Sequence, residues 1–461
     1  MILRNASGSS WGCCREKWLS LYNYFRIAYY VASLLRHTHW SRQRLLEHQN
    51  RKVREIVRYA YDNVAFYHEK LLQCGVKPED VKGVADLNKL PIVRREELQQ
   101  NSSKLVSREF DPEELKTVST SGSSGKPLFT YLTKKEDEFR KSKLLRPHIV
   151  CGQKAWDRWV LIEPTQHITH LGGLQKFLRV YSPMFVSIFD DVGKQVSTIE
   201  RLDPDVLDGY SNSLFLVAKE AERLGIKTIR PRFVMGGAEL TDAPSRKFLE
   251  EVFDAPFYDQ YATEELQMIA WQCPERSEYH VDADSVVVQF VDDEGNEVAP
   301  GERGELVCTS LFNHAMPFIR YALGDMGVPS AGQCCSCGRI FPLMKMVEGR
   351  KDSVVTLSNG RKVPALVFGW MMEFYRFYRD IYQYRIVQKR VDLLRVLIKK
   401  KANAASESEM RVELVRHMRS MLGLSGSEVT IEVEFVDEIP LDKSGKLRKI
   451  ISELESSEVN P

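Results

Sequence analysis

Short apolar segments alternate with helix-like segments between residues 159 and 252. Trp159 to Ile162 and Arg232 to Met235 have the composition of strands, and residues 212–224 and 243–252 have the apolar spacing of helices. Alternation of this kind favours parallel strands joined by helical crossovers that cover the faces of the sheet. The sequence therefore predicts an α/β fold with parallel-rich sheets flanked by helices.

The pattern of strands and charges changes after Arg350. Residues 382–388, 393–398 and 429–436 are predicted strands, and residues 407–422 have the spacing of an amphipathic helix. This arrangement predicts a small α+β domain at the C-terminal end. A chain of 461 residues also exceeds what one hydrophobic core usually serves, so at least two domains are expected.

Charge and cysteine content narrow the class of protein. The formal net charge of +2 comes from 65 basic and 63 acidic residues, which provides no general attraction for nucleic acid. Nine cysteines occur without a recognisable secretory segment, which argues for a reducing compartment. We therefore expect a cytoplasmic protein that does not bind nucleic acid.

The segment from Trp18 to Leu35 is rich in aromatic and aliphatic residues. Asn23 and Arg26 interrupt it, and it is short for a membrane span. A helix lying on a membrane surface is one interpretation, and a helix packed against the body of the protein is the other. The second is favoured, within a helical lead-in that covers residues 18–100.

A loop rich in glycine and hydroxyl groups runs from Ser119 to Pro127, with the sequence STSGSSGKP. Gly122 and Gly125 allow the backbone to approach an anion, and the hydroxyls add donors, so the loop is suited to phosphate. A Walker A loop requires a first glycine where Thr120 stands, and Ser or Thr after the lysine instead of proline, so that motif is excluded. The competing interpretation is a polar linker.

Five further elements follow this loop in a fixed order. They are YATE at 261–264, GERGEL at 301–306, RYALGD at 320–325, GRKD at 349–352 and PLDKSGK at 440–446. Together with the loop they resemble the ordered motifs of the adenylate-forming superfamily, which contains acyl-CoA synthetases and peptide-synthetase adenylation domains. Residues 63–67 and 87–91 resemble the lead-in of its phenylacetate-CoA ligase branch, which includes capsule-biosynthesis proteins. Ala262 departs from the family's usual glycine, which puts the fit of that turn against a nucleotide in doubt.

The resemblance implies a site for ATP and Mg²⁺. The phosphate loop would hold the β- and γ-phosphates through Ser121, Gly122, Ser123, Ser124, Gly125 and Lys126. Thr263 would lie near the α-phosphate, and Glu264 would bind Mg²⁺, an ion that prefers oxygen ligands. Without the resemblance, Glu264 and Glu265 would be interpreted as a solvated acidic pair.

The remaining nucleotide contacts are also implied by the resemblance. The backbone of Gly237, Ala238 and Glu239 would contact adenine, Tyr261 would stack on the ring, Asp325 would accept both ribose hydroxyls, and Arg350 would donate to ribose or phosphate. The alternative for these residues is a tight turn, a core tyrosine and ordinary surface charges.

Lys446 is the predicted mobile catalytic lysine. By resemblance it would reach the substrate carboxylate and the α-phosphate when a C-terminal lid closes, with Asp352 as the hinge. The predicted domains are therefore an AMP-binding domain at 1–351 and a lid at 352–461. A solvated basic run with Lys443, Arg448 and Lys449 is the alternative interpretation of this segment.

Four metal-ligand types are spread over the second half of the large domain: Cys273, His280, Cys335 and Cys337, with Cys334 as a substitute. Three thiolates and one imidazole suit a tetrahedral structural zinc site, and free thiols are the alternative. His170 occupies the position where relatives have a residue lining the acyl pocket. A hydrogen-bonded loop histidine is the other interpretation of His170.

Three functions are compatible with these features. The first is ATP-dependent activation of a small carboxylic acid to an acyl-adenylate, followed by transfer to coenzyme A, by an enzyme that the branch implies can be a homodimer. The second passes the acyl group to an amine or carrier protein, as in surface-polysaccharide or secondary-metabolite biosynthesis. The third is a catalytically silent, zinc-braced binding protein.

Overall fold

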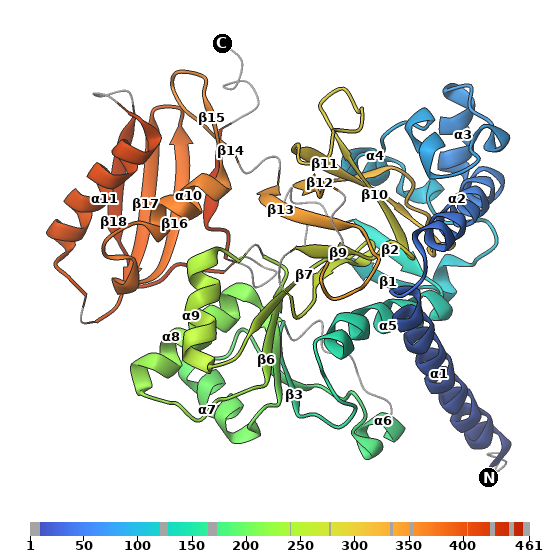
Figure 1. Cartoon of the computed structure of the whole chain (residues 1–461), viewed down its shortest axis with the longest axis horizontal. Coiled ribbons are helices and arrows are strands. Elements are labelled where there is room, and N and C mark those ends of the chain that lie inside the picture. The colour runs from blue at the N-terminus through green and yellow to red at the C-terminus, as the bar shows by residue number, and fades with distance from the viewer. Residues whose placement is uncertain are drawn as a thin grey trace, which may run out of the picture.

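The computed structural model describes residues 10–119, 128–164, 173–239, 241–275, 278–331, 335–350, 354–402, 404–424, 429–441 and 447–454. A large domain carries the N-terminal three quarters of the chain, and a small domain formed from Val354 onward lies beside it (Figure 1). The predicted hinge, Asp352, lies outside the described residues, so the predicted domain boundary stays a prediction.

The helices are α1 (Ser10–His37), α2 (Arg42–Asn63), α3 (Ala65–Gln73), α4 (Arg95–Gln100), α5 (Lys134–Val150), α6 (Gly173–Leu178), α7 (Val192–Leu202), α8 (Ser211–Leu224), α9 (Ala243–Phe253), α10 (Ala365–Glu373) and α11 (Glu407–Leu422). Short 3-10 turns occupy Pro78–Asp80, Val84–Lys89, Ser102–Lys104, Pro112–Glu114 and Tyr378–Asp380.

The strands are β1 (Lys116–Ser119), β2 (Phe129–Leu132), β3 (Trp159–Glu163), β4 (Met184–Ser187), β5 (Val206–Tyr210), β6 (Phe233–Gly237), β7 (Phe257–Thr263), β8 (Gln267–Gln272), β9 (Tyr279–Val281), β10 (Val286–Val291), β11 (Gly304–Ser310), β12 (Tyr321–Pro329), β13 (Leu343–Arg350), β14 (Val354–Thr356), β15 (Lys362–Pro364), β16 (Ile381–Arg390), β17 (Leu393–Lys400), β18 (Thr430–Phe435) and β19 (Ile450–Ser452).

One mixed sheet organises the large domain. Its strands follow the order β10-β11-β12-β13-β9-β8-β7-β6-β5-β3-β4. The part from β7 to β4 is parallel, and the part from β7 to β10 is antiparallel. The predicted α/β fold is thus confirmed, and the antiparallel half is an addition that the helix-strand alternation did not predict.

Alternate residues of the parallel strands pack against different layers, because successive side chains of a strand point to opposite faces. Val160 and Ile162 of β3 are buried in the core formed with α7, α8 and α9. Trp159 and Leu161 belong to the core on the other face, against which Leu144 of α5 packs. Helices therefore cover both faces of the parallel half, and its carboxyl-terminal edge is left for a site.

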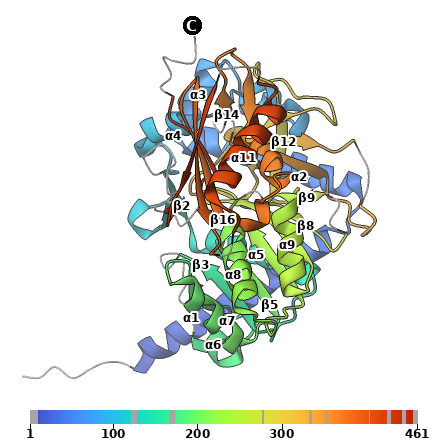
Figure 2. The same cartoon turned by 90° about the vertical axis from the view of Figure 1, so that its left-hand side faces the viewer.

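Helix α1 packs along α5 with its C-terminal half, and its N-terminal end projects from the body (Figure 2). Tyr30 meets Phe139 of α5 edge-on at 5.3 Å between ring centroids, and Arg26 pairs with Glu138. The helical lead-in begins at Ser10 and not at residue 18, and the interpretation as a packed helix is confirmed for this half. Within the described parts of the chain, no helix combines the length and apolar character that a membrane span needs.

The small domain has a four-stranded sheet in the order β18-β17-β16-β19, with its own buried core. Met410, Leu414, Met418 and Leu422 lie on one face of α11 at helical spacing and are buried in that core. The predicted helix 407–422 has the same bounds as α11, and the predicted strands correspond to β16, β17 and β18. This small domain is therefore the α+β unit expected from the sequence.

Candidate active site

Two predicted nucleotide ligands meet at the centre of the mixed sheet. The phenol of Tyr261, on β7, donates a hydrogen bond of 2.5 Å to the carboxylate of Asp325, on β12. Burial raises the pKa of Tyr261 well above its ordinary value, and the charge of Asp325 adds to the shift. The phenol therefore stays protonated and remains a donor at neutral pH.

Arg350 is brought to the same place by strand pairing. It is the last residue of β13, and its backbone pairs with that of Asp325 in the antiparallel register of β12 and β13. Three predicted nucleotide ligands, up to 89 positions apart in the sequence, are thus linked: Asp325 bonds Tyr261 through its side chain and pairs with Arg350 through its backbone. This convergence is what a nucleoside site built from the sheet requires.

Thr263 and Glu264 lie at the carboxyl end of β7. The Thr263 hydroxyl accepts a hydrogen bond of 3.2 Å from the amide of Leu266, which tightens the turn to β8. The side chain of Glu264 is 41% exposed, so its carboxylate is accessible to a hydrated ion. Glu265, next along, is buried and accepts hydrogen bonds from Tyr321 and Arg95, so the two neighbouring acids are not a solvated pair.

Arg140 was not singled out by the sequence, but it holds this turn. Its guanidinium donates to the carbonyl oxygen of Glu264 at 2.8 Å and lies 3.8 Å from the Glu264 carboxylate. Arg140 is on α5 and is buried, and a charged residue within a helix gives no sequence sign of such a contact. Arg140 therefore ties the turn after β7 to helix α5.

The turn after β6 contains Gly237, Ala238 and Glu239. Ala238 has φ of +66°, a left-handed conformation that residues with a β-carbon rarely adopt. The Glu239 carboxylate accepts hydrogen bonds from the amide of Asn212 at 3.1 Å and from the amide of Leu447 at 2.8 Å. The side chain of this predicted adenine-contacting residue therefore joins the two domains.

Several predicted site residues lie outside the described residues. They are the phosphate-loop residues Ser121, Gly122, Ser123, Ser124, Gly125 and Lys126, the pocket residue His170, the hinge Asp352 and the catalytic Lys446. For Arg350, the backbone is described and the side chain is not. Their roles stay predictions.

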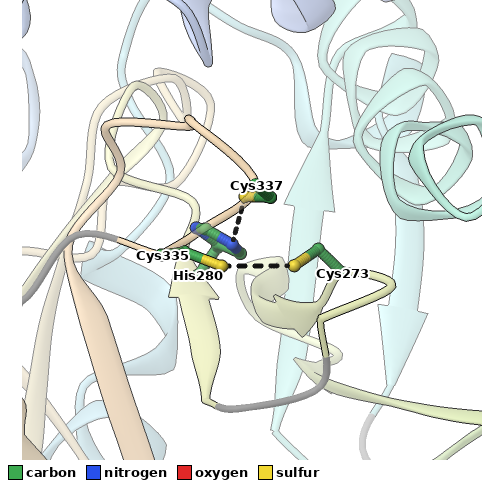
Figure 3. Close-up of side chains that lie close together, drawn as sticks. All are labelled: Cys273, His280, Cys335 and Cys337. Atoms are coloured by element: carbon green, nitrogen blue, oxygen red, sulfur yellow. Dashed lines mark hydrogen bonds between the residues drawn. The ribbon is translucent and has the colours of Figure 1, made fainter.

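The predicted metal ligands lie together in the structure (Figure 3). Cys273 follows β8, His280 is on β9, and Cys335 and Cys337 lie between β12 and β13. Their ligand atoms are all within 4.8 Å of one another, with 3.5 Å between the sulfurs of Cys273 and Cys335 and 3.4 Å from Cys337 Sγ to His280 Nε2. The substitute ligand, Cys334, lies outside the described residues.

The electrostatics of this cluster favour a neutral imidazole. Burial lowers the pKa of His280 to about 4, and Arg339 adds to the shift. Three sulfurs and one nitrogen at these distances are the donor set of a closed, four-coordinate zinc site. The residues therefore fit the metal that their types predicted.

Comparison with known proteins agrees with the family resemblance that the sequence motifs indicated. Residues 365–453 match the family described as the CapK C-terminal domain. The chain is 25% identical over 337 residues to a phenylacetate-coenzyme A ligase of Pseudomonas putida, with 70% of this chain and 74% of the relative aligned. It is 23% identical over 391 residues to the phenylacetate-coenzyme A ligase of Escherichia coli (strain K12), with 82% and 88% aligned. The chain belongs to the adenylate-forming ligase superfamily. Within it, the chain is phenylacetate-CoA ligase-like and carries a CapK C-terminal domain.

Solved structures share the fold of this chain across both domains. A 2-hydroxyisobutyryl-CoA ligase in the postadenylation state has a TM-score of 0.73, with 17% identity, 87% of this chain and 88% of that chain covered. An open conformation of that ligase, over the same 87% of this chain and 90% of its own, has a TM-score of 0.60 with 18% identity.

A further acidic residue lies at the carboxyl end of one of the parallel strands. Glu163 is the last residue of β3 and is partly buried. Burial raises the pKa of Glu163 to about 8, and Asp208 and Glu264 contribute to the rise. The carboxyl edge of the sheet therefore carries an acid beside Glu264 that no motif in the sequence indicated.

Proposed function

We propose that this adenylate-forming ligase activates a small carboxylic acid with ATP and transfers the acyl group to coenzyme A. In the first step a carboxylate oxygen bonds to the α-phosphorus, and the bond from that phosphorus to the bridging β-phosphate oxygen breaks and releases pyrophosphate. In the second step the thiolate sulfur of coenzyme A bonds to the acyl carbon, and AMP leaves. The net products are acyl-CoA, AMP and pyrophosphate.

The observation that carries the proposal is the hydrogen bond between Tyr261 and Asp325, with Glu264 three residues after Tyr261 at the carboxyl end of β7. Asp325 offers a carboxylate to vicinal ribose hydroxyls, and the hydrogen bond from Tyr261 holds that carboxylate in place. Glu264 offers an exposed carboxylate one position after β7. Adenylation builds charge on phosphate oxygens, so an adjacent cation site is what the reaction needs.

Magnesium would be held at Glu264. The ion prefers one or two carboxylates together with water and phosphate oxygens, and a partly exposed Glu264 beside the nucleotide ligands fits that preference. When bound, the ion would neutralise phosphate charge. Arg140 would keep the carboxylate from turning away, because it binds the backbone of the same residue.

Coenzyme A is the proposed acceptor because the similar curated proteins are named as phenylacetate-coenzyme A ligases. An amine or a carrier protein is the alternative acceptor, and no described residue favours it. The acid is proposed only as a small carboxylate.

We also propose that Cys273, His280, Cys335 and Cys337 hold a structural zinc ion. Three of the four side chains are buried and the fourth is partly buried, so a bound ion would be closed off from solvent and substrate. The ion would join the end of β8 and β9 to the segment before β13. Because β13 ends at Arg350, zinc would brace one wall of the nucleotide site.

The test is ATP-dependent pyrophosphate release with a panel of aryl, acyl and sugar acids, with and without coenzyme A. Lys446→Ala should abolish release with the acid that the wild type accepts, whereas Lys443→Ala, in the same basic segment, should retain it. Acid-dependent release without a coenzyme A requirement for turnover would point to the amine or carrier acceptor. Binding of ATP without release for any acid would overturn the proposal in favour of a silent binding protein.

A further inference from the structure

Glu163 lies on the face of the mixed sheet that α5 covers. It is two residues after Leu161 on β3, and alternate residues of a strand point to the same face. Leu161 is buried in the core against which Leu144 of α5 packs. The partly buried side chain of Glu163 therefore points toward α5, at the carboxyl end of the parallel strands.

Asp208 lies on the same face of the sheet, on the neighbouring strand. Its Cα is the register partner of Leu161 in the parallel pairing of β3 and β5. The Asp208 side chain is buried, and its carboxylate lies 3.2 Å from Nε2 of His148 on α5. Asp208 is therefore an acid whose partner comes from the helix layer.

His148 is an unsatisfied polar group in this part of the fold. The ring is fully buried, and although Nε2 is close to Asp208, neither ring nitrogen makes a hydrogen bond to a residue that the structure describes. A buried polar group without such a partner is rare, and it points to water or ligand atoms that satisfy it. The space between α5 and the sheet is therefore suited to a polar occupant.

Glu264, at the carboxyl end of β7, is the second acid whose charge acts on Glu163. Burial is the main cause of the raised pKa of Glu163, and the negative charges of Asp208 and Glu264 add to it. Glu264 is the proposed magnesium ligand, and the guanidinium of Arg140 lies 3.8 Å from its carboxylate. The charge of Glu264 is therefore balanced by a protein cation and by the proposed ion.

Glu163 differs from both of these acids. No hydrogen bond or ion pair joins its side chain to another residue in the described part of the chain. Charges of the same sign favour its neutral form, and the same charges favour a cation placed beside it. A buried carboxylate is costly unless it is paired, so a positively charged group that enters this space would form an ion pair with Glu163.

The strand order indicates how long an acid must be to reach Glu163. In the sheet, β3 is three strands away from β7, with β5 and β6 between them. Neighbouring strands are about 4.8 Å apart, so the ends of β3 and β7 are roughly 14 Å apart before their side chains extend. A carboxylate activated beside Glu264 therefore needs several atoms between it and a charged group at Glu163, more than the single carbon of an α-amino acid.

We propose that Glu163 is a specificity-determining residue, and that the activated acid carries a positively charged nitrogen at the end remote from its carboxylate. The proposal rests on the proposed ligase function. The ammonium group pairs with Glu163, which releases its proton to solvent, and the carboxylate of the acid remains near Glu264 for adenylation. An acid of the same length without the charge leaves Glu163 unpaired.

Two series of acids of matched size test the proposal in the full-length protein. One series is 4-(aminomethyl)benzoate, 4-(hydroxymethyl)benzoate and 4-ethylbenzoate, and the other is 6-aminohexanoate, 6-hydroxyhexanoate and heptanoate. Acid-dependent exchange of labelled pyrophosphate into ATP gives kcat/KM for each acid. In at least one series, the wild type should prefer the ammonium acid to the acid with a terminal methyl group by about tenfold or more, which is the usual effect of a hydrogen bond to a charged group.

Glu163→Gln separates specificity from stability, because glutamine has the size of a protonated glutamate and can replace it without a charge. The variant should lower kcat/KM for the ammonium acid by about tenfold or more, and should change that for the acid with a terminal methyl group by less than about threefold. Glu251→Gln, at an exposed carboxylate on α9, should retain the wild-type preference. An equal loss with all acids in Glu163→Gln, or a preference that survives in it, would overturn the proposal.

Failure of this inference can be distinguished from failure of the ligase function. Wild-type protein that exchanges pyrophosphate with uncharged acids at least as well as with ammonium acids would overturn the specificity and leave the ligase function standing. Wild-type protein that exchanges with no acid would overturn the ligase function. Calorimetric titration with 4-(aminomethyl)benzoate and 6-aminohexanoate would then decide the site: binding that is lost in Glu163→Gln would support it, and equal binding or none would overturn it.

Discussion

The phenol of Tyr261 lies 2.5 Å from the carboxylate of Asp325, and this hydrogen bond joins β7 to β12 across the intervening strands of the mixed sheet. The two residues stand in separate motifs, 64 positions apart. Because desolvation and the charge of Asp325 raise the pKa of the partly buried Tyr261, the phenol keeps its proton near neutral pH and remains a donor. Tyr261 therefore fixes the carboxylate that is proposed to bind ribose.

Tyr261→Phe should weaken ATP binding more than it slows the chemistry. The change removes a charge-assisted hydrogen bond and leaves Asp325 short of one partner, so the KM for ATP should rise about tenfold. Pyrophosphate release at varied ATP concentration measures it, with Tyr59→Phe, whose hydroxyl bonds Ser107 and Glu109 in the lead-in, as the control. An unchanged KM in Tyr261→Phe would show that Asp325 does not depend on this bond.

Substitutions at the adjacent residues Glu264 and Glu265 should have different effects, the first on activity and the second on stability. Glu264→Gln should reduce pyrophosphate release by about a hundredfold or more, because an amide is a poor ligand for the ion that neutralises phosphate charge. Its effect on unfolding should be small, since the Glu264 side chain is 41% exposed. Titration of activity with Mg²⁺ should show a raised requirement for the ion.

Glu265→Gln should behave in the opposite way. Its carboxylate is buried and bonds Tyr321 and Arg95, so loss of the charge should lower the free energy of unfolding by about 1–3 kcal/mol. Chemical denaturation measures this change. If Glu265→Gln abolishes activity at full stability while Glu264→Gln does not, the assignment of the magnesium ligand is wrong.

The sequence predicted parallel strands because the predicted strands at 159–162 and 232–235 alternate with the predicted helices at 212–224 and 243–252, whereas β4, β5 and β7 were not individually predicted. The bounds of α11 and the placement of β16, β17 and β18 were also predicted, since apolar spacing alone defines them. The antiparallel half was not, because pairings such as Leu343 with His280 join strands that are distant in sequence and carry no local pattern. Strand order depends on such long-range pairing.

Some features of the candidate site could be predicted from motifs, and others depend on long-range contacts that the sequence does not indicate. The proximity of Tyr261 and Asp325 followed from motifs, and the gathering of Cys273, His280, Cys335 and Cys337 followed from ligand types. The role of Glu239 between the domains could not be predicted, because its new partner is the backbone amide of Leu447, 208 positions away. A backbone donor leaves no trace in the identity of the residue that carries it.

Removal of zinc should destabilise the large domain. Protein purified without chelators should hold about one zinc ion per chain by elemental analysis, and Cys335→Ser should lower both the zinc content and the melting temperature, by about 5 °C or more. Cys74→Ser, at an exposed thiol on the surface, is the matched control. Wild-type protein that takes up no zinc, and that melts at the same temperature with and without a chelator, would refute the metal site.

The KM for ATP should respond to zinc as well. Arg350 is the last residue of β13, and the proposed zinc ligands Cys335 and Cys337 lie in the segment that leads to β13. Loosening that segment should therefore disturb the side of the proposed nucleotide site that β13 forms. At a temperature where the Cys335→Ser variant is still folded, its KM for ATP should therefore be higher than that of the wild type. An unchanged KM would restrict the ion to a purely local stabilising role.

Glu163 should make stability depend on pH. Its pKa is raised to about 8 from an ordinary value of 4.5, so between these values the folded protein binds more protons than the unfolded chain. The free energy of unfolding should then fall as pH rises through this window, by up to about 1.4 kcal/mol per unit for this one group. Glu163→Gln cannot ionise, so it should flatten the fall and be more stable than the wild type at pH 8.

Urea denaturation at pH 5, 6.5 and 8 measures the slopes, with Glu251→Gln, an exposed carboxylate on α9, as the control. Parallel slopes for the wild type and Glu163→Gln would show that Glu163 is not held protonated by its surroundings.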